Sequence, residues 1–235
     1  MLFRSFPVTI LSLRKSYIFT SNSRTSSSVG SKHITLICEA WLKARLGKLT
    51  ASRCADALAT TKTGESAYRK NLRLQLLAER LTGVPTLIPE TPAMRWGTEQ
   101  EPVAKLAFSE FTGLSVEDVG FIEHPLIKGL GASPDGFTSD GGLIEIKCPQ
   151  GPRHIENFLC ERVPSEYRPQ LLCQIACTGR SFVHWVSFHP MFPKASQIKV
   201  IRFEPTEEEV REFEVKMYDF LDELNHLEKR LADSN

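Results

Sequence analysis

Residues 143–148 restrict the fold more than any other segment of the chain. They read Leu-Ile-Glu-Ile-Lys-Cys, nearly all apolar around two charges, and they follow a strong turn signal at residues 139–142. A short run of this kind is typical of a strand that is covered on both faces. Glu145 and Lys147 occupy alternate positions, so their side chains point to the same face. Charges in such a place are costly unless something compensates them, and the strand therefore predicts a site rather than plain core.

A second extended run, residues 131–137, is predicted to pair with this strand as a hairpin across the turn. Asp135 would end that pairing and lie close to Glu145 and Lys147. A divalent cation offsets the desolvation of neighbouring carboxylates, and Mg²⁺ takes hard oxygen ligands while it keeps several waters. The carbonyl of Ile146 is a further candidate ligand. Lys147 would orient the attacking water or help to deprotonate it.

A third carboxylate is expected from a helix that packs on the hairpin. Glu101 lies in the predicted helix 96–111, whereas Glu99 would point about 200° away around the helix axis. Taken singly, each acidic residue has an ordinary interpretation, as a turn residue, a surface ion pair or a helix-surface carboxylate. The joint pattern favours a metal site, because strand, turn and strand fall where such a site needs them.

The remaining periodicities predict a mixed β-sheet flanked by helices, a single domain of the α/β class over residues 37–235. Helices are expected at residues 39–46, 53–59, 65–81, 96–111, 167–177 and 206–231, and strands at 115–124, 131–137, 143–148, 182–188 and 198–203. Residues 61–64 are expected to form a loop. The chain has no internal repeat and no Gly-rich phosphate loop.

Three helices carry more detailed expectations. The apolar face of helix 65–81 is predicted to include Leu81 at its end. The buried face of helix 96–111 is predicted to consist of Val103, Leu106, Ala107 and Phe111. Thr206 and Glu209 are spaced as a capping box at the start of the last helix. The inward positions of that helix are expected to be Phe213, Met217, Phe220, Leu221, Leu224 and Leu227.

The N-terminal segment, residues 1–36, is predicted to lie outside the fold. The first acidic residue of the chain is Glu39, and the residues before it are rich in Ser and contain several Arg and Lys. That composition fits an organelle transit peptide, a disordered tail, or a start codon upstream of the true one. The chain is therefore expected inside the cell, in the mitochondrion on the first interpretation and otherwise in the nucleus or cytoplasm.

The composition is that of a folded chain that does not cross a membrane. Of 235 residues, 41% are hydrophobic and 24% are charged, which excludes wholesale disorder. No apolar run approaches the roughly 18 residues that a membrane span needs. Lys and Arg number 29 against 28 Asp and Glu, a net charge of +1, so any basic surface for nucleic acid must be local. The 6 cysteines, with no Cys-x-x-Cys pair among them, are typical of reduced thiols.

The motif Pro134-Asp135 followed by Glu145-Ile146-Lys147 resembles the core signature of the PD-(D/E)xK nucleases, which have a restriction-endonuclease-like fold. The ordered set of motifs is similar to the YqaJ viral recombinase family, which includes lambda exonuclease, over about residues 39–230. The blocks that carry this resemblance are Thr50-Ala51-Ser52, Arg95-Trp96-Gly97 with Glu101, Ser133-Pro134-Asp135-Gly136, Glu145-Ile146-Lys147-Cys148-Pro149, and Gln170 with Gln174.

The resemblance implies a Mg²⁺-dependent DNA exonuclease, with Mn²⁺ as an alternative ion, that acts in DNA recombination or repair. Such enzymes resect linear duplex DNA from a 5′ end and leave a 3′ overhang for a single-strand annealing protein. Carried onto this chain, Lys147 is the catalytic lysine and Arg45 holds the terminal 5′-phosphate. The carboxylates of Glu101, Asp135 and Glu145, with the carbonyl of Ile146, are the metal ligands; Ser52, Ser133, Gln170 and Gln174 assist in DNA binding.

Several alternatives stay open at this point. The same core also serves endonucleases and non-catalytic DNA-binding proteins. Arg45 is otherwise a surface cation, and Gln174 part of a polar stripe on a buried helix. Residues 171–173 read Leu-Leu-Cys where relatives often carry a further glutamine, which puts DNA contacts there in doubt. Ring-shaped trimers such as that of lambda exonuclease are not encoded in these motifs, so a homo-oligomer is left open.

The cysteines allow one further alternative. Some nucleases of this superfamily hold an iron–sulfur cluster, which would require Cys54, Cys160, Cys173 and Cys177 to converge here. The close cysteine spacing of such clusters is missing, which favours buried, inert thiols.

Overall fold

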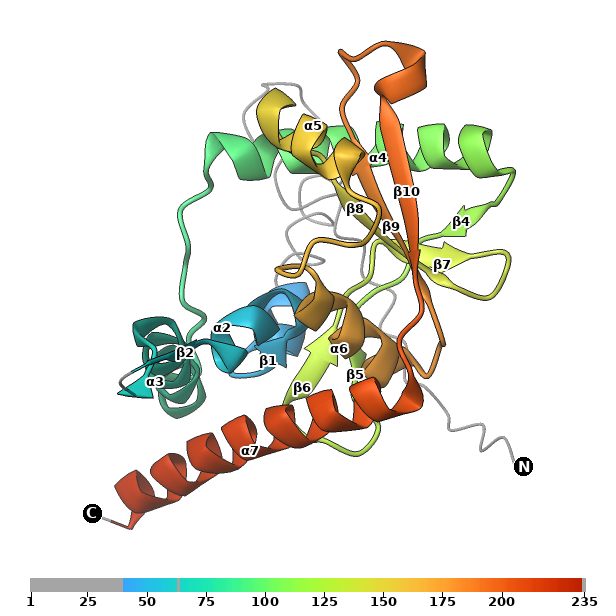
Figure 1. Ribbon diagram of the computed structural model, residues 1–235. Coiled ribbons are helices and arrows are strands. Elements are labelled where there is room, and N and C mark those ends of the chain that lie inside the picture. Colours follow the sequence, from blue (N-terminus) through green and yellow to red (C-terminus); the bar gives the residue numbers. More distant parts are fainter. Residues whose placement is uncertain (1–39, 63, 234–235) are drawn as a thin grey trace.

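The predicted strand 143–148 lies at the centre of the main sheet. The computed structural model describes residues 40–62 and 64–233, so the predicted tail 1–36 lies outside the described residues. The five strands follow the order β10 (Ile198–Phe203), β9 (Val183–Phe188), β8 (Leu143–Lys147), β7 (Gly136–Thr138) and β4 (Val116–Glu117) (Figure 1). The pair β8–β9 is parallel and the other pairs are antiparallel, which confirms a mixed sheet.

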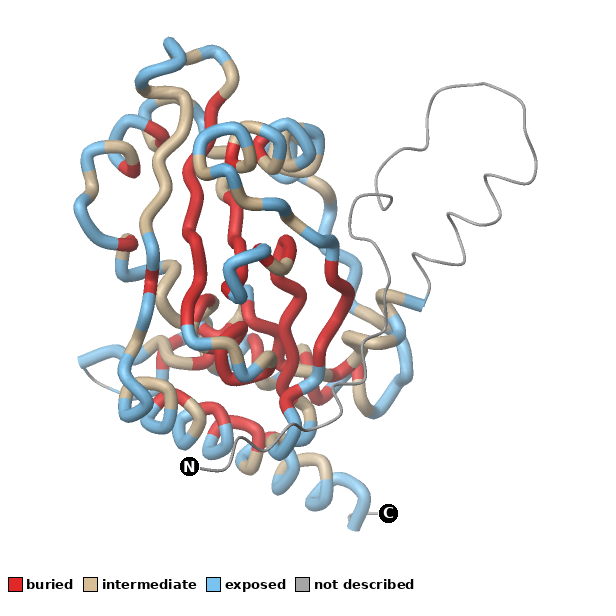
Figure 2. Tube along the Cα trace, turned by 90° about the vertical axis from the view of Figure 1, so that its right-hand side faces the viewer, coloured by how far each residue is buried: buried red, intermediate tan, exposed pale blue. Residues whose placement is uncertain are grey.

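Both faces of β8 are covered, as its sequence predicts. Helix α4 (Pro92–Thr112) packs Ala104 and Phe108 on the face of Ile144 and Ile146. Helix α6 (Arg168–Thr178) packs on the opposite face, which carries Leu143. Figure 2 shows the buried strands in the middle of the molecule with exposed segments around them. Because side chains alternate along a strand, Glu145 and Lys147 share the face of Leu143 and point toward α6.

A second, three-stranded sheet lies beside the first. Its order is β1 (Leu49–Thr50), β6 (Leu130–Ala132) and β5 (Ile122–Glu123), with β1 parallel to β6. It packs in one hydrophobic cluster with helices α2 (Cys54–Leu58), α3 (Ala67–Thr82), α6 and α7 (Glu207–Ala232). The long helix α7 runs beneath α6 in Figure 1 and also contacts α2 and α3.

Two predicted strands are wrong, because the chain changes sheet within each. Run 131–137 divides into β6 and β7, and run 115–124 divides into β4 and β5. Pro134 interrupts the first run because a proline has no N–H to donate to a strand ladder. Asp135 therefore lies in a connection between two sheets. The direction of its side chain is not determined there by the alternation of side chains along a strand.

The predicted buried face of α4 is also wrong, except for Ala107, which is partly buried and packs against the core. Val103, Leu106 and Phe111 are exposed by 45%, 67% and 65%, whereas Ala104 and Phe108 are fully buried. The helix carries two interleaved apolar stripes, and periodicity alone does not select between them. The buried stripe lies one turn beyond Glu101, so the packing of Ala104 and Phe108 turns Glu101 toward β8. Leu81 on α3 is likewise exposed rather than buried.

Most other elements agree with the sequence. The capping box of Thr206 and Glu209 opens α7, whose predicted inward side chains are buried except for the partly buried Leu227. Predicted helix 53–59 is a short 3₁₀ turn η2 (Ala51–Arg53) followed by α2. The predicted loop 61–64 is a small hairpin of β2 (Thr60–Thr61) and β3 (Gly64–Glu65). Of the elements that the structure describes, α5 (Gly151–Leu159), η3 (Lys194–Ser196) and the short strand β1 were not predicted.

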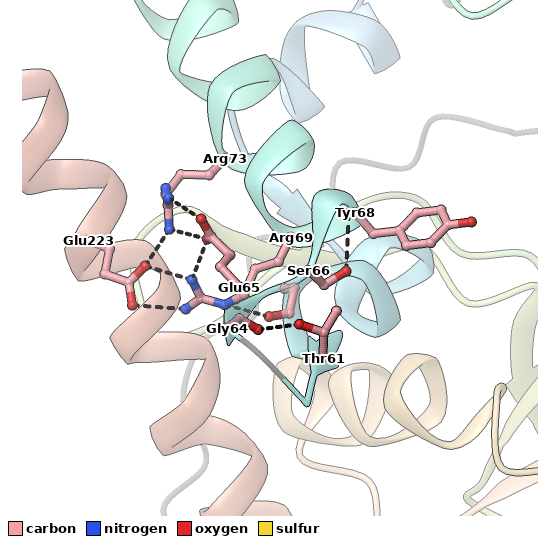
Figure 3. A network of polar contacts seen from close by, with 9 residues as sticks. Thr61, Gly64, Glu65, Ser66, Tyr68, Arg69, Arg73 and Glu223 are labelled. Carbon is pink, nitrogen blue, oxygen red and sulfur yellow. Dashed lines mark hydrogen bonds and ion pairs between the residues drawn. The ribbon is translucent and has the colours of Figure 1, made fainter.

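An ionic network joins α3 to α7 (Figure 3). Glu223 on α7 accepts hydrogen bonds from Arg69 at 2.7 and 2.9 Å and from Arg73 at 2.8 Å. Glu65 of β3 pairs with both arginines. The hydrogen bonds from Arg69 hold the pKa of Glu223 below its ordinary value.

Among the described residues, no helix combines the length and apolar character that crossing a bilayer requires.

Candidate active site

The predicted catalytic residues line one cleft of about 570 Å³ at the end of β8, between α4 and α6. Its walls come from α4, from the β6–β7 connection, from β8 and the residues after it, and from α6. The lining residues are Ala93, Met94, Gly97, Thr98, Glu101, Asp135, Glu145, Ile146, Lys147, Cys148, Pro149, Tyr167 and Gln170. Residues far apart in the sequence therefore meet where the motif pattern predicts.

Asp135 is fixed against β8 by backbone hydrogen bonds. Its Oδ2 accepts from the amide of Ile146 at 2.7 Å, and its own amide donates to the carbonyl of Ile144 at 3.1 Å. The next residue must be glycine, since a Cβ on Gly136 would stand 2.5 Å from Val116 Cγ1 and 2.8 Å from a backbone oxygen. The pair Asp135-Gly136 thus serves packing between β4 and β7 as well as the cleft.

The Glu145 carboxylate is buried and accepts three side-chain hydrogen bonds. Its Oε1 accepts from Lys147 Nζ at 2.7 Å and from Gln170 Nε2 at 2.6 Å, and its Oε2 accepts from Gln174 Nε2 at 2.5 Å. Lys147 Nζ also donates to Gln170 Oε1 at 2.9 Å. Gln170 and Gln174 are one helical turn apart, and the structure brings both onto the same carboxylate. These contacts compensate the desolvation of Glu145.

Glu101 reaches the cleft from α4 and forms an ion pair with Lys105. The distance from Glu101 Oε1 to Lys105 Nζ is 3.0 Å, and Lys105 also binds Asp118 at 2.8 Å. Burial alone would lower the pKa of Lys105, but Glu101 and Asp118 together raise it, so the ammonium stays charged. Glu99 is exposed and does not line the cleft, as predicted.

The Cys148 thiol reports the negative charge at this end of the cleft. Burial raises the pKa of Cys148 to about 12, with further contributions from Asp135 and Glu101. Both carboxylates therefore lie close enough to this thiol to disfavour its anion. The thiol is protonated at neutral pH and is no candidate nucleophile.

The donor set suits a hard cation. Carboxylates and a backbone carbonyl are the oxygen ligands that Mg²⁺ takes, and it usually needs only one or two protein carboxylates beside waters and phosphate oxygens. In residues 40–62 and 64–233, however, no group of three or more His, Cys, Asp and Glu side chains is arranged to hold a metal ion. Coordination by Glu101, Asp135, Glu145 and the Ile146 carbonyl around one ion thus stays a prediction.

Arg45 lies next to the cleft, at the end of the helical residues 40–45. Its Nη1 donates to Ser133 Oγ at 3.3 Å, and its guanidinium stacks 4.2 Å from the centre of the Trp41 ring. Burial lowers the pKa of Arg45 to about 10, which still leaves it charged at neutral pH. Ser133 and Asp135 belong to the same β6–β7 connection, so this cation is tied directly to the carboxylate end of the cleft.

Ser52 belongs to the same region by strand register. Strands β1 and β6 are parallel, with Thr50 opposite Gly131. The chain leaves both strands at the same end, where Ser52 follows β1 and Ser133 follows β6. Ser52 is exposed and Ser133 is buried. The three residues predicted to bind a terminal phosphate therefore gather at one end of the small sheet.

Two aromatic residues were missed by the sequence patterns. Tyr167 lines the cleft one turn before Gln170, and its ring centre is 5.2 Å from Lys147 Nζ. Trp41 supplies the ring under Arg45, one turn before it. The signal available in the sequence was the helical spacing of each ring from a predicted site residue, because such pairs share a face.

The cysteines form no metal site in the described part of the chain. Cys54, Cys173 and Cys177 are buried, and the sulfurs of Cys173 and Cys177 are 3.9 Å apart. Burial raises the pKa of both of these thiols well above the ordinary value. Cys160 follows α5, and its Sγ donates to the carbonyl of Glu156 in that helix. This arrangement favours inert thiols over an iron–sulfur cluster.

Comparisons with known proteins identify the family and the fold. A family model described as the YqaJ-like viral recombinase domain matches residues 40–181. No curated protein matches the sequence. The crystal structure of the alkaline exonuclease LHK-Exo from Laribacter hongkongensis is 41% identical, with a TM-score of 0.77 over 83% of this chain and 97% of that chain.

Two further solved structures extend the comparison. LHK-Exo in complex with dAMP gives the same identity, coverage and TM-score. A phage-related exonuclease from Haemophilus somnus 129PT has a TM-score of 0.61 at 11% identity, over 80% of this chain and 96% of that chain. At that identity the likeness concerns the fold alone.

Proposed function

Because the chain belongs to the YqaJ-like viral recombinase family, we propose that it is a metal-dependent exonuclease that degrades linear duplex DNA from a 5′ end during recombination. The chain is a nuclease with the fold of the alkaline exonuclease that it matches. One observation carries the proposal: Glu145 and Lys147 meet Gln170 in a cleft that Asp135 and Glu101 also line.

The contacts of Lys147 suit proton handling at a scissile phosphate. Its ammonium is held between Glu145 Oε1 and Gln170 Oε1, which fixes its direction in the cleft. In that position Lys147 orients the attacking water and takes part in moving its proton. Gln170 donates to the Glu145 carboxylate and accepts from the Lys147 ammonium, so it fixes the position of the two groups relative to each other.

The carboxylates of the cleft are the proposed ligands of the metal cofactor. Glu101, Asp135 and Glu145, with the Ile146 carbonyl, would hold Mg²⁺ or Mn²⁺. When bound, the ion supplies Lewis-acid stabilisation of phosphate oxygens and lowers the pKa of a bound water. Glu101 pairs with Lys105, and Glu145 pairs with Lys147 and accepts from the amides of Gln170 and Gln174, so both carboxylates lie beside compensating groups.

The Arg45 region accounts for the choice of a DNA end. A guanidinium and two hydroxyls satisfy a phosphate dianion, and such a group exists only at a phosphorylated terminus. Arg45 donates a hydrogen bond to Ser133, which lies two residues before Asp135 in the β6–β7 connection. An end held there leaves the neighbouring phosphodiester close to the cleft, which favours an exonuclease over an endonuclease on the same core.

The function is tested by digestion of linear duplex DNA with purified protein, with Mg²⁺ or with a chelator. We expect cleavage with Mg²⁺, none with chelator, and recovery when Mg²⁺ is restored. Covalently closed circular DNA of the same sequence is the control and should persist. Equal rates on circular and linear DNA would indicate an endonuclease, and DNA binding by folded protein without cleavage would indicate a non-catalytic binding protein.

Arg45→Ala is expected to remove the preference for 5′-phosphorylated ends. Truncation of one partner in a buried charged contact costs at least ~2 kcal/mol, which corresponds to about thirtyfold in relative rate. The measurement compares initial rates on 5′-phosphorylated and 5′-hydroxyl duplexes. Arg202→Ala is the control, because Arg202 lies on β10 and pairs with Glu204. An unchanged preference in the Arg45→Ala protein would contradict the phosphate role.

The proposal also covers partners and compartment. The 3′-ended strand left by 5′ resection is the substrate of a single-strand annealing protein, and a homo-oligomer would keep several clefts on one duplex. Pull-down with tagged protein and analytical ultracentrifugation test these two parts. Location of a tagged full-length chain and sequencing of its mature N-terminus test a mitochondrial, nuclear or cytoplasmic site.

A further inference from the structure

The turn that follows Arg45 is held from outside by two adjacent residues of α3. The amide of Lys48 donates to the carbonyl of Arg45 at 3.0 Å and closes the turn around Gly47. Gly47 has a φ of +64°, in the left-handed region that glycine adopts without strain. The turn ends at β1, the strand whose exit carries Ser52.

Glu79 binds one side of this turn. Its Oε2 accepts the amide of Gly47 at 3.1 Å, and its Oε1 accepts from Gln75 Nε2 at 3.0 Å and from the amide of Thr86 at 3.2 Å. The residue is only 7% exposed. Burial alone would raise the pKa of Glu79, but these hydrogen bonds together lower it, so the carboxylate is charged at neutral pH.

Arg80 binds the other side of the same residue. Its Nε donates to the carbonyl of Gly47 at 2.9 Å, and its Nη1 donates to Asn225 at 2.8 Å and to Glu228 at 3.0 Å on α7. A Cβ on Gly47 would stand 2.6 Å from Arg80 Cγ, so the turn and this side chain are in close contact. Both backbone polar groups of Gly47 are thus fixed by α3, and Arg80 carries the connection to α7.

We propose that Glu79 and Arg80 are positioning residues for the terminal-phosphate site, which they support by fixing the Gly47 turn and through it Arg45. The inference rests on the proposed function of Arg45. Burial of the Glu79 carboxylate carries a desolvation penalty, which makes its hydrogen bond to the Gly47 amide an inefficient means of stabilising the fold. It is a suitable way to fix a backbone whose guanidinium must meet a phosphate, because binding groups act only when held in the productive geometry.

The arrangement leaves Arg45 supported at both ends. The Trp41 ring and the Ser133 hydroxyl hold its guanidinium, and the clamped turn holds its backbone. Loosening of the turn moves the Cα of Arg45 relative to Ser133, which belongs to a different sheet connection. The distance between the Arg45 guanidinium and the Ser133 hydroxyl then varies. The preference for a 5′-phosphorylated DNA end over a 5′-hydroxyl end is therefore lost before cleavage itself.

The test uses Glu79→Gln in the full-length chain. The amide offers one acceptor oxygen where three donors converge, so at least one of the hydrogen bonds from Gly47, Gln75 and Thr86 is lost. The readout is the ratio of initial rates on 5′-phosphorylated and 5′-hydroxyl duplexes. Because both substrates meet the same folded fraction, partial unfolding cancels from this ratio. We expect the ratio to fall by about tenfold, less than the loss expected for Arg45→Ala, because a displaced guanidinium keeps part of its contact with the phosphate.

Two variants keep the test sharp. Glu223→Gln is the matched control: Glu223 also joins α3 to α7, but its hydrogen bonds in the described part of the chain come from Arg69 and Arg73 rather than from Gly47, so its ratio should match that of the wild type. Arg80→Lys keeps the charge but loses the guanidinium that reaches Gly47, Asn225 and Glu228 together, and its ratio should fall as in Glu79→Gln. It also serves if Glu79→Gln fails to fold.

The double variant Arg45→Ala/Glu79→Gln separates positioning from an independent effect. If Glu79 acts through Arg45, the double variant has the same ratio as Arg45→Ala alone. A ratio unchanged by both Glu79→Gln and Arg80→Lys, while Arg45→Ala lowers it, overturns this inference and leaves the proposed function intact. A wild-type protein without preference for 5′-phosphate overturns the phosphate site itself, and this inference with it.

Discussion

Asp135→Asn is expected to lower the rate of duplex DNA hydrolysis by about 10³-fold or more, since metal-assisted charge stabilisation supplies several kcal/mol of the barrier reduction. Asparagine keeps the shape of the side chain, and its carbonyl oxygen still accepts the hydrogen bond from the Ile146 amide. The fold should therefore survive while the negative charge that would bind the ion is lost. The measurement is the initial rate on linear duplex over a range of Mg²⁺ concentrations.

Asp140→Asn is the matched control for this variant. Asp140 lies in the turn between β7 and β8, accepts hydrogen bonds from Thr138 and Gly142, and pairs with His184 away from the cleft. A change there tests whether the hairpin merely needs its acidic residues to fold. Near wild-type hydrolysis by the Asp135→Asn protein, or equal losses in the two variants, would count against a metal role for Asp135.

Lys147→Ala is expected to lower the rate by about 10²- to 10⁴-fold, the usual contribution of a positioned acid–base group. Glu145 would keep its hydrogen bonds from Gln170 and Gln174, so the truncated site remains paired. DNA affinity should change much less than the rate of the chemical step. Single-turnover cleavage together with a binding titration at fixed salt separates the two quantities.

Lys194→Ala provides the control for loss of a positive charge. Lys194 is 86% exposed and approaches only Glu110, at 4.0 Å, among the ion pairs observed for it. Its removal should leave both cleavage and binding near wild type. If the Lys147→Ala protein cleaves DNA at a rate close to that of the Lys194→Ala protein, the proposed part of Lys147 in proton handling is wrong.

The sequence predicted those parts of the molecule whose signals are local. The turn at residues 139–142, the doubly covered strand β8 and the capping box at Thr206 each depend on neighbouring residues, and the structure confirms them. The site motifs were also readable, because alternation along β8 and helical spacing on α6 decide which side chains share a face. Glu145, Gln170 and Gln174 meet for that reason.

The missed features depend on contacts between distant segments. Pro134 marks the break in run 131–137, but the placement of its first part in a second sheet depends on β1 and β5, which pair with β6. The buried face of α4 is selected by Ile144 and Val186 on the sheet rather than by the helix itself. The clamp on Gly47 is invisible in the sequence for the same reason, since Glu79 and Arg80 follow it only after the whole of α2 and most of α3.

The short connection from β6 to β7 has a consequence for the size of the product. It carries Ser133, which is bonded to Arg45, and Asp135, which is bonded to β8, with a rigid proline between them. If the chain binds the DNA terminus beside Ser133 and cleaves beside Asp135, this connection sets the distance between the bound end and the cleaved phosphodiester. Every cut would then fall at one fixed distance from the end, and the released fragments would be uniform in length whatever their base sequence.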